Sequence, residues 1–141
     1  MSFVLDNSVT MRWFFGDGSA RSAKYAEQVL DLLGSQDALV PATWGLEVSN
    51  VLARAEAKGL TTEARSTEFL ELLASANIDV DEQTFARALG DTLHLARRHK
   101  LSSYDASYLE LAMRKGIPLA TLDDELQPAA SKAGVRRFGE T

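Results

Sequence analysis

Four acidic side chains lie at positions in this chain where carboxylates could act together: Asp6, Glu47, Asp105 and Asp123. Unpaired carboxylates that lie close together repel one another and raise one another's pKa values. A hard divalent cation such as Mg²⁺ or Mn²⁺ relieves that repulsion, since such ions prefer oxygen ligands. A cation held in this way can activate water for hydrolysis. The chain has no cysteine, and His94 and His99 are five residues apart on one expected helix, so no softer set of ligands competes.

Asp6 and Asp123 each come directly after an apolar run that is expected to form a strand. The first run covers residues 3–5 and the second covers residues 117–122. If the two strands are parallel, both acids project from the same edge of the sheet. Ligands bind at that edge in open α/β sheets.

Both acids also have a purely structural interpretation. Asp6 or Ser8 could cap a helix that begins near residue 9. Thr121 with Asp124 could form a capping box for the last helix.

Glu47 lies at the border of the apolar face of an expected helix, residues 44–58. It comes three residues after Trp44, and Asn50 follows on the same side. A carboxylate there is costly unless it is paired or bound to a metal, and Arg54 is the alternative partner. Asp105 carries a similar ambiguity, because it stands three residues after a serine where a capping box would place an acid.

Short apolar runs alternate with amphipathic stretches along the whole chain. Strands are expected at 3–5, 38–40, 78–80, 117–122 and 135–138. Helices are expected at 9–15, 22–33, 44–58, 62–74, 82–99, 103–114 and 125–132. Apolar strands separated by helices are typical of a mostly parallel sheet covered on both faces, hence a three-layer α/β/α sandwich. A length of 141 residues suits a single domain, residues 1–141.

The formal net charge of −5 argues against a nucleic-acid partner, unless several of the acids hold cations. Three basic pairs exist, Arg97-Arg98, Arg114-Lys115 and Arg136-Arg137, and we interpret them as solvated helix ends and strand edges in preference to a nucleic-acid surface. The N-terminus lacks the pattern of a signal peptide, and no apolar run approaches the roughly 20 residues of a membrane span. Together with the absence of cysteine, this favours a cytoplasmic protein without membrane contact.

The segments around the four acids resemble a known family when they are taken in order. Residues 4–9, 47–52, 101–106 and 119–123 are similar to the motifs of PIN domains, and more narrowly to VapC-type toxins of bacterial toxin–antitoxin pairs. The likeness covers essentially the whole chain.

The resemblance implies roles for the residues that match. Asp6, Glu47, Asp105 and Asp123 match the four acidic positions. Ser8 and Thr121 match supporting hydroxyls, and Asn50 is a further supporting candidate on the Glu47 side. Asp124 could replace Asp123, although Asp123 has the expected spacing from Thr121.

The family's fold and activity follow as expectations from the same resemblance. They are a parallel sheet in an α/β/α sandwich, endoribonuclease activity with Mg²⁺ or Mn²⁺, an RNA substrate, a homodimer, and a cognate antitoxin as inhibitor. The aromatic run Trp13-Phe14-Phe15 is expected to be mostly core, and part of it could line a groove for an antitoxin helix.

Three other classes of protein fit less well. A phosphatase with an aspartate nucleophile favours a second Asp where Ser8 stands, and a signalling receiver domain wants an extra acid pair near the first strand. A non-catalytic RNA- or protein-binding module stays open as the main alternative.

Overall fold

The computed structural model describes residues 1–139. Its strands are β1 (Ser2–Leu5), β2 (Asp37–Val40), β3 (Ile78–Val80) and β4 (Leu119–Ala120). Its helices are α1 (Asn7–Phe14), α2 (Ala20–Leu33), α3 (Trp44–Ala57), α4 (Glu63–Ser75), α5 (Thr84–Arg87), the π-helical turn η1 (Ala88–Thr92), α6 (Leu93–His99), α7 (Ser103–Lys115) and α8 (Leu126–Lys132). Over these described residues, no helix combines the length and the apolar character that a membrane span requires.

The four strands form one parallel sheet in the order β3-β2-β1-β4. In the centre, Val4 of β1 is in register with Leu39 of β2 and Leu119 of β4. The backbone N–H of Asp6 donates to the carbonyl of Ala120 at 3.0 Å, so β1 and β4 end side by side. The sheet therefore brings the chain segments after these two strands to one edge.

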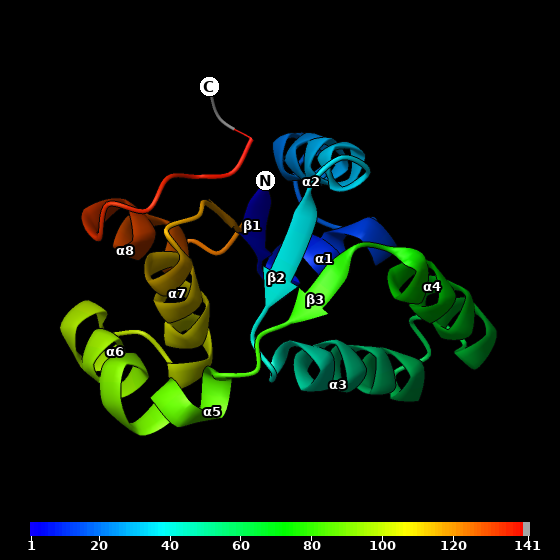
Figure 1. The fold of residues 1–141 in the computed structure, drawn as a ribbon. Coiled ribbons are helices and arrows are strands. Elements are labelled where there is room, and N and C mark those ends of the chain that lie inside the picture. Colours follow the sequence, from blue (N-terminus) through cyan, green and yellow to red (C-terminus); the bar gives the residue numbers. More distant parts are fainter. Residues whose placement is uncertain (140–141) are drawn as a thin grey trace.

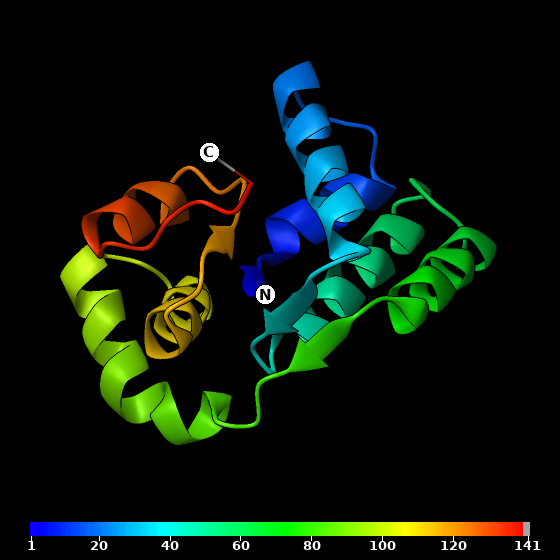
Figure 2. The ribbon, with the colours of Figure 1, turned by 45° about the horizontal axis from the view of Figure 1, so that its top comes forward.

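The alternation of side chains along β1 divides the core between two faces. Val4 packs with residues of α7 and α8 on one face, whereas Phe3 and Leu5 pack with α2 on the other. Figures 1 and 2 show α7 and α8 on one side of the sheet and α1 and α2 on the opposite side. The predicted three-layer α/β/α sandwich is confirmed.

A third cluster fixes the position of α3 next to the sheet. Met11 of α1, Val48 and Leu52 of α3 and Phe69 of α4 form this cluster. Trp44, at the start of α3, packs against all three clusters, and its indole N–H donates to Thr10 Oγ1 at 3.1 Å. The aromatic side chain thereby joins the first turn of α3 to α1.

The expectation of one continuous helix over residues 82–99 is wrong. The segment is divided into α5, the π-helical turn η1 and α6. A π turn holds more residues than an α turn, so the register of the buried face shifts. Thr92 and Leu95 are buried, whereas Phe85 is 68% and Leu89 is 89% exposed, although the two are four residues apart, as on the apolar face of a regular helix.

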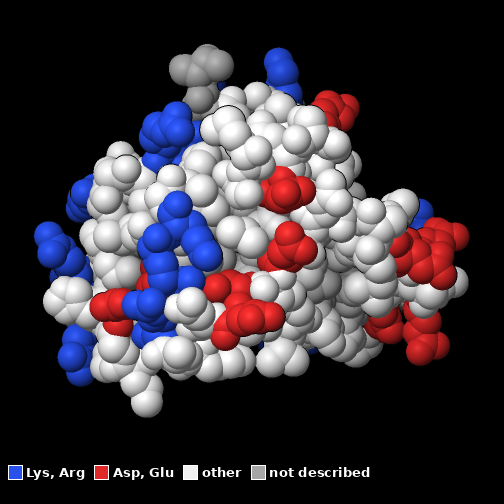
Figure 3. Space-filling view, viewed as in Figure 1, with Lys and Arg blue, Asp and Glu red and all other residues white. Residues whose placement is uncertain are grey.

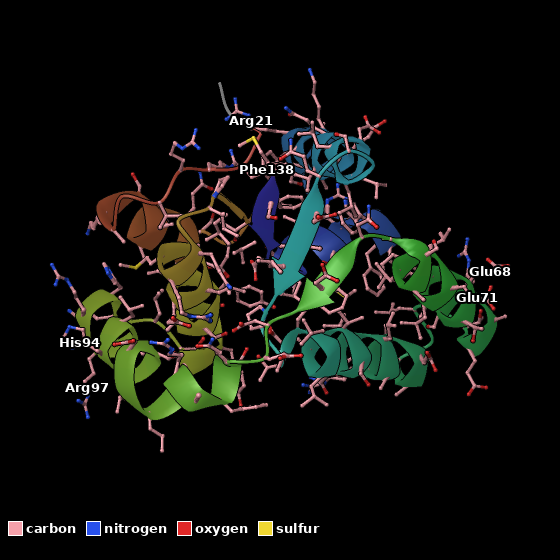
Figure 4. The ribbon with its side chains drawn as sticks, in the orientation of Figure 1. Arg21, Glu68, Glu71, His94, Arg97 and Phe138 are labelled. Atoms are coloured by element: carbon pink, nitrogen blue, oxygen red, sulfur yellow. The ribbon has the colours of Figure 1, made fainter. Side chains whose placement is uncertain are left out.

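The expected strand at residues 135–138 is also wrong. This segment forms one isolated parallel bridge, between Leu119 and Arg137. Its neighbour β4 is only two residues long, not the six residues of 117–122, because the chain turns away after Ala120 toward the start of α8. Phe138 still packs on the sheet, with its ring stacked on Phe3 at a centroid distance of 3.8 Å, and Figure 4 shows it close to β1.

Candidate active site

Asp6 lies at the carboxyl end of β1 and is only 3% exposed. Two hydroxyls donate to its Oδ2 atom, Ser8 Oγ and, at 2.7 Å, Thr121 Oγ1. Burial raises the pKa of Asp6, the two hydrogen bonds lower it, and the charge of Asp123 raises it again; the net pKa lies above the ordinary value. Both hydroxyls contact one oxygen, so the other oxygen of this buried carboxylate lies outside these two contacts.

Glu47 projects from the first turn of α3 toward Asp6 and Asp105. Burial raises its pKa to about 7, with an opposing hydrogen bond from Tyr108 and further increases from the charges of Asp6 and Asp105. Tyr108 Oη donates to Glu47 Oε1 at 2.8 Å. The alternative ion pair with Arg54 is absent among residues 1–139.

Asp105 lies in the first turn of α7, which Ser102 caps. Ser102 Oγ accepts from the backbone N–H of Asp105 at 3.1 Å, and interaction with the same serine side chain lowers the pKa of the Asp105 carboxyl. Burial raises the pKa of Asp105 to about 6, and the charges of Asp123, Asp6 and Glu125 act in the same direction. Asp105 therefore lies within the electrostatic range of the acids that follow both β1 and β4.

Asp123, and not Asp124, is the acid that influences this group. Its charge raises the pKa values of two of the other three acids, while Asp124 is exposed and influences none of them. Asp123 also caps α8, since its Oδ1 accepts from the backbone N–H groups of Glu125 at 2.8 Å and Leu126 at 2.9 Å. The capping box considered between Thr121 and Asp124 is wrong, because Thr121 Oγ1 accepts from the backbone N–H of Asp123 at 3.0 Å and not from Asp124, and it donates to Asp6.

The supporting residues expected from the sequence divide into two groups. Ser8 and Thr121 both contact Asp6, and Ser8 Oγ also accepts from the backbone N–H of Leu122 at 3.0 Å, which ties α1 to the segment after β4. Asn50 is exposed and donates no hydrogen bond to any of the acids in the described part of the chain. The structure thus brings together six of the seven expected site residues and leaves Asn50 apart.

Two features of the site region were missed in the sequence. Tyr108 was assigned to the apolar face of its helix, but its buried hydroxyl reaches Glu47. A signal was present, because a fully buried tyrosine hydroxyl needs a polar partner. Arg114 was interpreted as a solvated helix end, yet it bridges two buried acids, Asp81 at 2.6 Å and Glu110 at 2.8 Å. Burial raises the pKa of Asp81, but the hydrogen bonds and charge of Arg114, together with hydrogen bonds from the Gln83 backbone and Thr84, bring it below the ordinary value.

The other two basic pairs have different surroundings. The guanidinium of Arg137 lies over the ring of Tyr25, 3.8 Å from its centroid. Arg97 and Arg98 are exposed in the last turn of α6. The space-filling view shows Lys and Arg side chains mostly on the left of the molecule, with acids beside them, across the middle and on the far right (Figure 3). Figure 4 shows Arg97 pointing outward on that left side, from α6.

The chemistry of the four acids fits a divalent cation. All the donors are oxygen atoms, and at least three of the carboxylates have pKa values raised by burial and mutual repulsion. Among residues 1–139, no three His, Asp or Glu side chains already lie close enough together to hold a metal ion. The carboxylates would therefore have to move closer around a cation, whose charge removes the repulsion between them.

The fold and the acids at the edge of the sheet define the class of protein. The chain belongs to the PIN domain family, which matches residues 3–132. The resemblance found in the sequence motifs is thereby confirmed.

Three known proteins illustrate the likeness. Ribonuclease VapC3 of Pyrobaculum aerophilum is 35% identical over 80 residues, which cover 57% of this chain and 61% of that protein. The crystal structure of VapBC2 from Rickettsia felis, bound to a DNA fragment from their promoter, matches with a TM-score of 0.62 at 10% identity, over 92% of this chain and 93% of that one. VapC20 of Mycobacterium tuberculosis, a sarcin-ricin loop cleaving toxin, matches with a TM-score of 0.60 at 16% identity, over 90% and 94%. At these identities the two structural matches concern the fold.

Proposed function

We propose that this chain is a metal-dependent endoribonuclease and the toxin of a type II toxin–antitoxin pair. The observation that carries the proposal is the convergence of four carboxylates from four separate segments, three of which, Asp6, Glu47 and Asp105, have pKa values raised by burial and by the charges of the other acids. Membership of the PIN domain family and the similarity to ribonuclease VapC3 support RNA as the substrate.

In this proposal, Asp6 and Asp105 are the chief ligands of one or two Mg²⁺ or Mn²⁺ ions. Glu47 and Asp123 complete the site directly or through water. When bound, the cation supplies activation of a water molecule and stabilisation of charge on the phosphodiester. Ser8 and Thr121 hold one oxygen of Asp6 and thereby orient its carboxylate.

RNA cleavage in the presence of Mg²⁺ or Mn²⁺ tests the activity. We expect 5′-phosphate and 3′-hydroxyl ends, and we expect Asp6→Asn to reduce cleavage at least about 100-fold with the fold intact by circular dichroism. Recovery of 2′,3′-cyclic phosphate ends would contradict hydrolysis by activated water, because they arise from attack by the substrate's own 2′-hydroxyl.

The neighbouring acids Asp123 and Asp124 offer a matched comparison. Asp123→Asn should lower cleavage strongly, whereas Asp124→Asn, with the same change of charge one residue away, should leave it within about twofold of wild type. Equal effects of both variants would assign the loss to net charge and not to a ligand.

A non-catalytic binding module is the second candidate. It would bind RNA or protein through the same surface without divalent-dependent cleavage. Cleavage that persists undiminished in the Asp105→Ala protein would indicate a contaminating nuclease and favour this candidate. The phosphatase alternative is weaker, because Ser8 occupies the expected second Asp position and donates its hydroxyl to Asp6.

A cognate antitoxin is the protein partner that we propose. The likeness to VapBC2 supports such a partner. A cavity of about 400 Å³ between α1 and α4 has Phe14, Phe15, Phe69 and Leu72 among its lining residues, with Arg65 and Glu68 as its charged groups. An amphipathic antitoxin helix would bury its apolar face there. Hydrogen-exchange protection of these residues on addition of the partner tests the assignment, and protection confined to other surfaces would contradict it.

A homodimer and a cytoplasmic location remain expectations of the same proposal. Leu46 is 71% and Tyr104 is 61% exposed, and each adjoins one of the acids in sequence, so a second copy could cover them near the site. Sedimentation of the wild-type protein and of a Leu46→Asp variant tests the dimer. A wild-type monomer at micromolar concentration would contradict it.

A further inference from the structure

Tyr108 connects the elements that carry three of the four acids. It lies on α7, three residues after Asp105 and on the same helix face, with no solvent exposure. Its ring packs in the cluster that includes Val4 and Leu109. Its hydroxyl crosses to α3, where it donates to Glu47 Oε1 at 2.8 Å.

The direction of this hydrogen bond follows from its acceptor. A carboxylate oxygen can only accept, so the Tyr108 hydroxyl is the donor to Glu47. The backbone of Asn7, the residue directly after Asp6, also acts on the Tyr108 hydroxyl. One hydroxyl on α7 therefore donates to α3 and lies near the segment that follows β1.

A buried tyrosine hydroxyl needs some hydrogen-bond partner, and a structural role must be weighed first. Tyr25 shows what such a role looks like in this protein, since its hydroxyl donates to the main-chain carbonyl of Phe138 at 2.8 Å. Tyr108 differs, because its acceptor is a proposed ligand. In the described part of the chain, it also makes the one side-chain hydrogen bond that joins α3 to α7.

We propose that Tyr108 is a positioning residue, which holds one oxygen of Glu47 and so sets where this carboxylate stands relative to Asp6 and Asp105 when a cation binds. The inference rests on the proposed metal-dependent function. Outer partners of metal ligands commonly contribute 10- to 100-fold to metal affinity, because they orient the ligand before the metal arrives.

Titration calorimetry of Mn²⁺ with the whole chain tests this role without any measurement of activity. Tyr108→Phe keeps the ring in the core and removes only the hydroxyl, and we expect about tenfold weaker Mn²⁺ binding. The matched control is Tyr25→Phe, which removes the other buried tyrosine hydroxyl and should leave Mn²⁺ affinity unchanged. Equal losses in the two variants, or no loss in Tyr108→Phe, would overturn the proposal.

A double-mutant cycle with Glu47→Gln makes the test independent of any general loss of stability. If Tyr108 acts through Glu47, Tyr108→Phe should weaken Mn²⁺ binding much less in the Glu47→Gln background than in the wild type. Additive losses would refute action through Glu47. Failure of the wild-type protein to bind Mn²⁺ would instead overturn the proposed metal-dependent function, and the role of Tyr108 with it.

Discussion

Replacing Glu47 with glutamine should stabilise the metal-free protein at alkaline pH. The pKa of Glu47 is raised from 4.5 to about 7, mainly by burial. Above that pKa the folded protein holds an ionised carboxylate in poor surroundings, close to the charges of Asp6 and Asp105. Glutamine has nearly the same shape, keeps an oxygen that can accept from Tyr108, and carries no charge.

The magnitude follows from the pKa difference. A change from 4.5 to about 7 corresponds to about 3.4 kcal/mol at 1.36 kcal/mol per pKa unit. Glu47 is only half-buried, so solvent screening reduces this figure, and we expect about 1–1.5 kcal/mol, or a rise in Tm of about 3–5 °C.

The raised pKa of Glu47 also fixes how the stability of the wild type changes with pH. Between pH 4.5 and 7 the folded state keeps the Glu47 proton that the unfolded state has lost, so the free energy of unfolding of the wild type falls as the pH rises. The advantage of Glu47→Gln should be absent near pH 4.5 and complete near pH 8.

Urea unfolding followed by circular dichroism in EDTA, at pH 5 and pH 8, measures the effect. The control is Glu71→Gln, which changes an exposed glutamate on α4, far to the right in Figure 4, and should show no comparable gain. Saturating Mn²⁺ should make the wild type more stable than Glu47→Gln, because only the wild type keeps all four acids for binding. A Glu47→Gln protein no more stable than wild type at pH 8 would refute the electrostatic reasoning.

Two further predictions concern the arginines. Arg114→Met should destabilise the fold by about 3–5 kcal/mol in urea unfolding, since it leaves two buried carboxylates unpaired; a loss below about 1 kcal/mol would contradict this. The double variant Arg97→Ser, Arg98→Ser should raise KM for RNA several-fold, leave kcat unchanged and reduce the salt dependence of binding, because both side chains are exposed on the basic side of the molecule. Arg54→Ser, Lys58→Ser at the end of α3 is the control with equal charge loss, and an equal rise in KM there would point to net charge alone.

The sheet could be predicted because short apolar runs leave little choice of structure. The run at residues 3–5 is buried on both sides, as a central parallel strand requires, and the polar residue directly after it must lie at the sheet edge. The same logic brought Asp123 to this edge although the strand bound was wrong, because β4 ends at Ala120, three residues before Asp123. The segment 135–138 is apolar only at its two ends, and a strand also needs a long enough neighbour, whereas β4 offers only two residues.

The remaining errors have local physical causes that periodicity does not reveal. A π-helical turn around Gly90 shifts the buried face, so Leu95 of the following helix is buried while Leu89, within the turn, is exposed. Asn50 shares a helix side with Glu47, but one helical turn is enough to carry a short side chain away from the site. Tyr108 acts across two helices, and its partner is known only once these helices are placed.

The most direct measurement of the central claim is an anomalous difference map, recorded at the manganese absorption edge, from crystals of the protein soaked with Mn²⁺. We expect a peak bordered by the carboxylates of Asp6, Glu47, Asp105 and Asp123, and no peak there in Asp6→Asn crystals soaked in the same way. Wild-type crystals at saturating Mn²⁺ with no peak at these four side chains would contradict the account.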